Sequence, residues 1–164
     1  MTHIVPHGTD VGISAMEAAT ILSLIGAMNI PGRLLMGRIS DSLGRKATAV
    51  TCPLFLAGAI ISLIYSKDLW MFYLFAVVFG FFFGGLSTVT TAMIGDTFGL
   101  RSIGIIMGTF SAGWALGAAM GPFIGGLVYD ISNSYSVAFS ICAAAMIMVT
   151  LLLALTKQET KLDR

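Results

Sequence analysis

The chain has 164 residues and a formal net charge of +1, with 57% of its residues hydrophobic and 10% charged. Soluble domains carry roughly 25% charged residues, and a water-soluble core of this size could not bury so much apolar surface. The composition therefore excludes an ordinary soluble domain and indicates a protein embedded in the lipid bilayer. It also gives no sign of a nucleic-acid partner, since no basic stripe with interleaved aromatic residues is present.

Five apolar runs organise the chain. They predict membrane-spanning helices over 15–37, 47–65, 69–97, 102–129 and 135–156. Each run has about 19–29 residues, enough to cross ~30 Å of hydrocarbon at 1.5 Å per residue, and none alternates like a barrel strand. We predict an all-α membrane protein with a five-helix domain over 15–156. Residues 1–14 are expected to form an outer-side segment and residues 157–164 a tail.

A charged stretch separates the first two apolar runs and predicts a short loop between two helices. It runs from Gly37 to Lys46, and its glycines and charged residues are Gly37, Arg38, Asp41, Gly44, Arg45 and Lys46. Asp41 is expected to follow a helix end, and the basic residues could pair with it or with Asp96. Two interpretations stay open: a solvated loop that sets topology, or a charge cluster that holds one side of a pathway shut.

The loop and tail cations fall on one side of the predicted helices. That side carries Arg38, Arg45, Lys46, Arg101, Lys157, Lys161 and Arg164, against Lys67 on the other. Because cytoplasmic loops are enriched in lysine and arginine, we expect this side, with the C-terminus, to be cytoplasmic in a multi-pass cell-membrane protein. Five spans then put residue 1 outside, so at least one further span is expected upstream.

An internal repeat supports a further upstream span. Gly32, Gly37 and Asp41 recur at one constant spacing as Gly121, Gly126 and Asp130. The first and fourth runs therefore end alike, although they end on opposite sides, as in an inverted-topology repeat. The repeat pairs the second run with the fifth, and it places the partner of the third run before residue 1.

Several motifs resemble the major facilitator superfamily. The stretch G37-R-I-S-D41-S-L-G44-R45-K46 resembles its loop signature, and 113–126 resembles its glycine-proline helix pattern. H3-I-V-P-H7, N29-I-P-G-R33 and F79-G-F-F-F-G-G-L-S-T resemble monocarboxylate transporters and oxalate–formate antiporter-like proteins. The resemblance covers essentially the whole chain, as the C-terminal half of such a carrier. It implies a missing N-terminal half, in the same or a separate chain.

The same resemblance assigns a substrate site. In this branch an arginine in the helix matching the first run binds the substrate carboxylate, and Arg33 occupies that position. Monocarboxylate transporters often carry an aspartate four residues earlier, where this chain has Asn29, so proton coupling through that position is not implied. Oxalate-type exchangers have a lysine in the helix matching 102–129, where this chain has none. A small monoanion is therefore favoured over a dianion.

The residue types alone also support a substrate site around Arg33, and they leave other roles for Arg33 open. A guanidinium inside a span costs about 2.5–3.5 kcal/mol and is retained when it binds an anion, pairs within the protein or snorkels to the headgroups. Asn29 shares its helical face. Ser87 and Thr91 belong to a polar patch that could line the pathway, or their hydroxyls could bond to their own helix.

Small residues recur at helical spacing in two of the runs. Gly113, Gly117, Gly121 and Gly125, next to Pro122, lie on one helix face, and Gly80 and Gly84 share another. We interpret both stripes as helix-packing surfaces.

The predicted function is secondary active transport of small organic anions by alternating access, as an antiporter or a symporter. The alternatives are a non-transporting fragment or split subunit that needs a separate N-terminal half, and a major facilitator drug exporter. No enzyme is predicted, because no nucleophile–base pair or phosphate-binding loop is recognisable. No cofactor is implied. His3, His7 and Asp10 lack the spacing of a metal site.

Overall fold

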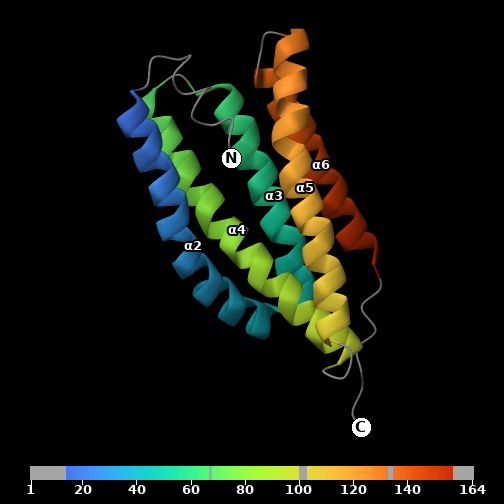
Figure 1. Ribbon diagram of the computed structural model, residues 1–164. Coiled ribbons are helices and arrows are strands. Elements are labelled where there is room, and N and C mark those ends of the chain that lie inside the picture. The colour runs from blue at the N-terminus through green and yellow to red at the C-terminus, as the bar shows by residue number, and fades with distance from the viewer. Residues whose placement is uncertain (1–13, 67, 100–102, 133–134, 157–164) are drawn as a thin grey trace.

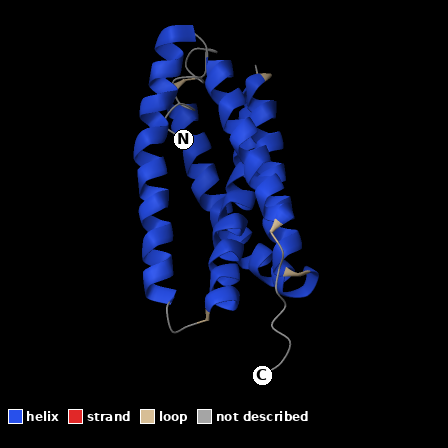
Figure 2. Ribbon diagram, turned by 90° about the vertical axis from the view of Figure 1, so that its right-hand side faces the viewer, coloured by secondary structure: helices blue, strands red, loops and turns tan. Residues whose placement is uncertain are grey.

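Five long helices make up the computed structural model, which describes residues 14–66, 68–99, 103–132 and 135–156. In chain order they are α2 (Ala15–Leu43), α3 (Arg45–Ile64), α4 (Leu69–Phe98), α5 (Ile103–Ser132) and α6 (Tyr135–Leu155) (Figures 1 and 2). Each is long and apolar enough to cross a membrane, and the described residues contain no strand. The predicted all-α membrane fold is confirmed. The predicted tail, and the outer segment apart from Ser14, lie outside the described residues.

The first helix begins with a cap that the sequence encodes. The Ser14 side chain accepts a hydrogen bond from the Glu17 backbone N–H, and the Glu17 carboxylate accepts one from the Ser14 backbone N–H at 2.9 Å. This reciprocal arrangement satisfies two amides that the helix leaves unpaired, and an acidic side chain suits the positive end of the helix dipole. The helix then continues through Pro31 and curves beneath α4 (Figure 1).

The predicted loop between the first two helices is wrong in its extent. α2 continues to Leu43 and α3 begins at Arg45, so Gly44 alone separates them. Asp41 therefore lies in the last turn of α2 and does not follow a helix end. The reason is that no strong helix breaker stands between Gly37 and Gly44, since a single glycine costs a helix only about 1 kcal/mol. Gly44 ends α2 because it adopts φ 97°, a conformation that L side chains rarely adopt.

The most extensive helix contact is between α2 and α4, which run parallel. Glycine makes this contact close. Gly32 of α2 faces the backbone carbonyl of Phe81, while Gly80 and Gly84 of α4 face the carbonyls of Ile25 and Asn29. Small residues let helix backbones approach in lipid, where burial of apolar area drives little association. The packing role predicted for Gly80 and Gly84 is confirmed.

The other helices extend this pair into a bundle. α3 packs against α4 and α6, and the apolar core joins residues of α2, α3, α4 and α6 around the fully buried Phe72. α5 makes only sparse contacts, with α6 and α4, and none of the most apolar part of this helix is buried. In Figure 1, α2 and α5 lie toward opposite edges of the bundle. A large apolar surface is therefore left for lipid or for protein partners.

Replacing Gly32 tests the close contact between α2 and α4. In Gly32→Ala the new Cβ would overlap the Phe81 carbonyl, so we expect overpacking to lower the stability by about 1–3 kcal/mol. Gly26→Ala is the matched control on the same helix, because nothing lies within 4 Å of a Cβ placed there. Thermal unfolding of the detergent-solubilised protein measures both. Equal melting temperatures for the two variants would contradict this description of the contact.

Candidate functional site

Arg33 and Asn29 form a hydrogen-bonded pair on one turn of α2. The Arg33 Nε donates to Asn29 Oδ1 at 2.8 Å. Arg33 is exposed and Asn29 half-buried. Asn29 is held in place by its backbone, because its carbonyl lies against Gly84 of α4. The pair therefore sits beside the closest helix contact in the protein, where its position is well defined.

The guanidinium of Arg33 points along α2 toward the middle of the helix. Its partner Asn29 lies one turn nearer the N-terminus, in the direction that side chains on a helix normally lean. The end of α2 at Leu43 lies ten residues further on, about 15 Å away at 1.5 Å per residue. The charged group is thus directed away from the nearer end of its helix.

No carboxylate neutralises Arg33 within the described part of the chain. The ion pairs found there involve Asp41 and Asp96, and both are made by Arg45. With Nε engaged by Asn29, the two Nη groups form the outward end of the guanidinium. Two parallel N–H donors on a fixed plane match the two oxygens of a carboxylate.

Ser87 and Thr91 lie on α4, one and two turns beyond the contact between Gly84 and Asn29. Both are exposed. The Thr91 hydroxyl donates to the Ser87 carbonyl at 2.9 Å, so its bonding within its own helix, one of the two predicted alternatives, is realised. The structure joins Arg33 to Asn29 by a hydrogen bond and gives no such bond from either of them to Ser87 or Thr91 in the described residues.

A charge cluster joins three helices around Gly44. Arg45 Nη1 lies 2.7 Å from Asp41 Oδ1, and Arg45 Nε lies 2.6 Å from Asp96 Oδ2 near the end of α4. Arg45 Nη1 also donates to the hydroxyl of Ser40 at 3.1 Å. One guanidinium therefore ties the end of α2, the start of α3 and the end of α4 together. Both pairings expected from the sequence are present.

Ser40 is a member of this cluster that the sequence analysis missed. It is 1% exposed, and its hydroxyl donates to the Gly37 carbonyl at 2.8 Å while accepting from Arg45. A lone serine carries no sequence signal for this role. The turn at Gly44 brings Arg45 back to it, and the sequence located that turn only within a longer predicted loop from Gly37 to Lys46. Arg38 and Lys46, also expected in the cluster, make no ion pair within the described residues.

Three glycines of the α5 stripe meet no neighbouring helix in the part of the chain that the structure describes. Nothing lies within 4 Å of a Cβ placed at Gly113, Gly117 or Gly121, and all three are exposed. Pro122 is exposed as well and Gly125 half-buried. The neighbouring Trp114 does meet α4, edge-to-face with Phe83 at a ring distance of 6.0 Å. The packing role of the stripe stays a prediction.

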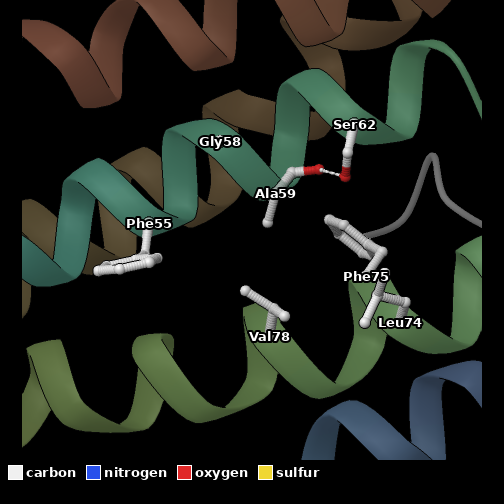
Figure 3. A pocket seen from close by; sticks show the side chains of 7 residues that line it. All are labelled: Phe55, Gly58, Ala59, Ser62, Leu74, Phe75 and Val78. Carbon is white, nitrogen blue, oxygen red and sulfur yellow. Dashed lines mark hydrogen bonds between the residues drawn. The ribbon is translucent and has the colours of Figure 1, made fainter.

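A groove between α3 and α4 differs chemically from the Arg33 region. It has a volume of about 230 Å³ and is lined by Phe55, Gly58, Ala59, Ser62, Leu74, Phe75 and Val78 (Figure 3). Its one hydroxyl, on Ser62, already donates to the Ala59 carbonyl at 2.8 Å. A groove so apolar offers an anion no compensating donor. The groove is therefore poorly suited to an anion.

Comparison with known proteins agrees with this architecture. Residues 3–164 match the family model of the Major Facilitator Superfamily. The chain is 28% identical to monocarboxylate transporter 12 of Rattus norvegicus, over 99% of this chain and 34% of the relative. It is 24% identical to monocarboxylate transporter 7 of Homo sapiens (94% and 30%) and 27% identical to the MFS-type transporter YcxA of Bacillus subtilis (97% and 41%).

The match covers nearly all of this chain, yet the chain spans only about a third of the length of the first of these relatives. The fold, the helix lengths and the family match agree with one another. The chain therefore belongs to the Major Facilitator Superfamily, in which it resembles the monocarboxylate-transporter branch.

Proposed function

We propose that this chain is the C-terminal half of a secondary active transporter for small organic monoanions, and that Arg33 binds the substrate carboxylate. The observation that carries the proposal is the Arg33–Asn29 pair: a permanently charged fork within a membrane-spanning helix, with no acidic partner in the described residues. The names of the relatives, which include monocarboxylate transporters 12 and 7, agree with it.

The direction of the Arg33 side chain favours substrate binding over snorkelling. A snorkelling arginine extends toward the nearer headgroups so that its charge stays hydrated. Arg33 instead leans toward the middle of α2, where its Nε meets Asn29. A guanidinium that points toward the middle of a membrane-spanning helix is stabilised only by a water-filled cavity or by an anion. Alternating access supplies both, because the central pathway is filled by water or by substrate.

Asn29 orients the Arg33 guanidinium without changing the charge of the site. By accepting from Nε, its side chain directs the paired Nη groups of Arg33 outward for a bidentate contact. Because an amide carries no charge, the pair bears the single positive charge of the guanidinium. A carboxylate with a single negative charge then neutralises it. Ser87 and Thr91, exposed on α4, are the hydroxyls we assign to the adjoining wall of the pathway.

The Arg45 cluster suits a gate at one end of the pathway. Its ion pairs join the end of α2, the start of α3 and the end of α4, and they bias a two-state rocking motion only if they break in the other state. Arg45 reaches both Asp41 and Asp96, so one side chain could release two contacts at once. We assign Asp41, Gly44, Arg45 and Asp96 to this gate, because they form the contacts at this end of the helices. The positive-inside bias favours a cytoplasmic location for it.

Substitution of Arg33 tests the substrate site in the complete carrier. Arg33→Ala removes both donors of the bidentate contact, and we expect uptake of labelled lactate or formate to fall about 100-fold, equivalent to ~3 kcal/mol of charge-assisted hydrogen bonding. Arg33→Lys keeps the charge without the fork and should lose less. Asn29→Ala should fall between Arg33→Lys and the wild type.

Arg38→Ala is the control, because Arg38 is an exposed arginine on the same helix and is assigned no substrate contact. Transport measured in proteoliposomes under an imposed gradient distinguishes the variants. If Arg33→Ala transports an anion as well as Arg38→Ala does, the site assignment is wrong. If it continues to export neutral or cationic compounds, the drug-exporter alternative is supported instead.

A double-mutant cycle tests the gate contact. Arg45→Ala and Asp96→Asn should not be additive, because each removes the same ion pair, whose partners are 26% and 56% exposed. For a partly exposed pair we expect a coupling of about 0.5–1 kcal/mol in thermal unfolding. Arg38→Ala combined with Asp96→Asn should be additive. Zero coupling between Arg45 and Asp96 would show that their contact does not stabilise this state.

Residues 1–164 alone should not transport. Five helices of one half leave α5 with only sparse contacts, and a pathway between two halves needs the second half. Proteoliposomes holding only this chain should therefore accumulate no labelled lactate or formate above protein-free vesicles, whereas co-reconstitution with the N-terminal half should restore uptake. Accumulation by the chain alone would refute the two-half proposal.

A further inference from the structure

We propose that the groove between α3 and α4 binds one acyl chain of a membrane phospholipid. The lipid belongs to the leaflet at the end of the bundle away from the Arg45 cluster, and it is held more firmly than the lipids that merely surround the protein. This lipid site is separate from the substrate site proposed at Arg33. It goes beyond the transport function and does not depend on which substrate is carried.

The groove opens on an apolar face of the protein. Both α3 and α4 are long and apolar enough to span the membrane, and the groove is lined on α4 by Leu74, Phe75 and Val78. Val78 and the exposed Ser87 lie about two and a half turns apart at 3.6 residues per turn, which places them on opposite faces of α4. The groove therefore faces away from the exposed hydroxyl of Ser87.

The shape of the groove suits a narrow ligand. Ala59 and Phe75 are buried and form its floor, whereas Phe55 and Leu74 are exposed at its rims. The labelled side chains of α3 and α4 face each other across it (Figure 3). Gly58 keeps it open, because nothing lies within 4 Å of a Cβ placed there. A helix with its side chains is about 10–12 Å across, so a volume of about 230 Å³ cannot admit one.

The lining offers nothing to a polar ligand. Ser62 carries the only polar side chain in it, and the Ser62 hydroxyl already donates to the Ala59 carbonyl at 2.8 Å. A polar ligand would lose its hydration there without gaining a hydrogen-bond partner. A hydrocarbon chain has no such cost and gains dispersion contacts with the aromatic and aliphatic lining. The chemistry therefore selects a ligand that is apolar along its whole bound length.

The groove also has the direction and depth of an acyl chain. On α3 it extends from Phe55 to Ser62, about 10 Å at 1.5 Å per residue, within the half of the helix away from Arg45. One leaflet supplies about half of the ~30 Å hydrocarbon core, so the groove covers most of its depth. At the deeper end the Phe55 ring stacks on Phe82 of α4 at 4.3 Å and bridges the two helices. A chain that hangs from a headgroup at the membrane surface enters from the other end.

Photolabelling of the complete carrier tests the proposal. The carrier is reconstituted in phosphatidylcholine vesicles that contain a small fraction of phosphatidylcholine with a diazirine in one acyl chain, and labelled peptides are identified by mass spectrometry after irradiation. We expect Leu74 and Val78 to be labelled several-fold more than Ile141, which is exposed near the same end of α6. Gly58→Leu should lower labelling of the groove to the level of Ile141, because the new side chain occupies the open space.

Two variants are the controls. Gly108→Leu makes the same change at an exposed glycine of α5 with nothing within 4 Å of an added Cβ, and it should leave labelling of the groove unchanged. Ser62→Ala removes the hydroxyl without filling the groove. Labelling should persist in Ser62→Ala, because an acyl chain needs no polar contact, and its loss would overturn the assignment of an acyl chain.

Three further outcomes would overturn the proposal. Equal labelling of the groove and Ile141, or labelling that Gly58→Leu does not change, would mean that only the surrounding lipid is present. No labelling of the groove would mean that another helix or a second copy covers it. If Gly58→Leu does not elute as a single folded species, Ser62→Leu fills the groove from its shallow end and is subject to the same expectation.

Discussion

The close contact between α2 and α4 is the constraint on which the rest of the structure depends. Lipid gives helices little hydrophobic reason to associate, so the packing must come from backbones that approach closely. Gly32, Gly80 and Gly84 make that approach sterically feasible. Because the Asn29 carbonyl lies in this contact, the turn of α2 that carries Arg33 is held firmly against α4. A rigid support of this kind suits the substrate site proposed at Arg33, since a misplaced guanidinium would make weaker hydrogen bonds to a carboxylate.

The same constraint places the ends of the helices. Parallel packing of α2 and α4 brings Asp41 and Asp96 to the same end of the bundle, and the turn at Gly44 returns Arg45 to both of them. The gate proposed there and the site proposed at Arg33 thus lie on the same two helices. A tilt of that pair as one body would move both together. A carrier that works by rocking needs the gate and the substrate site to move together, so that the site opens to one side of the membrane at a time.

α2 and α5 have similar sequence patterns but differ in how much of their surface is packed against other helices. The two helices end with the same residues at the same spacing, yet α2 is covered by α4 and α5 is nearly bare. A glycine-rich face exposed to lipid would bring no gain, because glycine lowers helix stability without adding contacts. The packing role predicted for these glycines would account for the composition of α5.

The sequence by itself determined the membrane class, the five helices and their approximate bounds, because apolar runs of membrane length can hide their backbone amides in lipid only as helices. It also indicated Arg33 and Asn29, since a cation inside an apolar run is costly wherever it occurs. It could not place the end of α2 at Leu43 or find Ser40. Both depend on the backbone at Gly44, whose positive φ brings Arg45 back across the turn. The bond between Asn29 and Arg33 spans one turn of a single helix, so the sequence spacing already allowed it. Only the tertiary structure decided that Arg45 pairs with Asp96, because this contact joins the start of α3 to the end of α4, which no local pattern encodes.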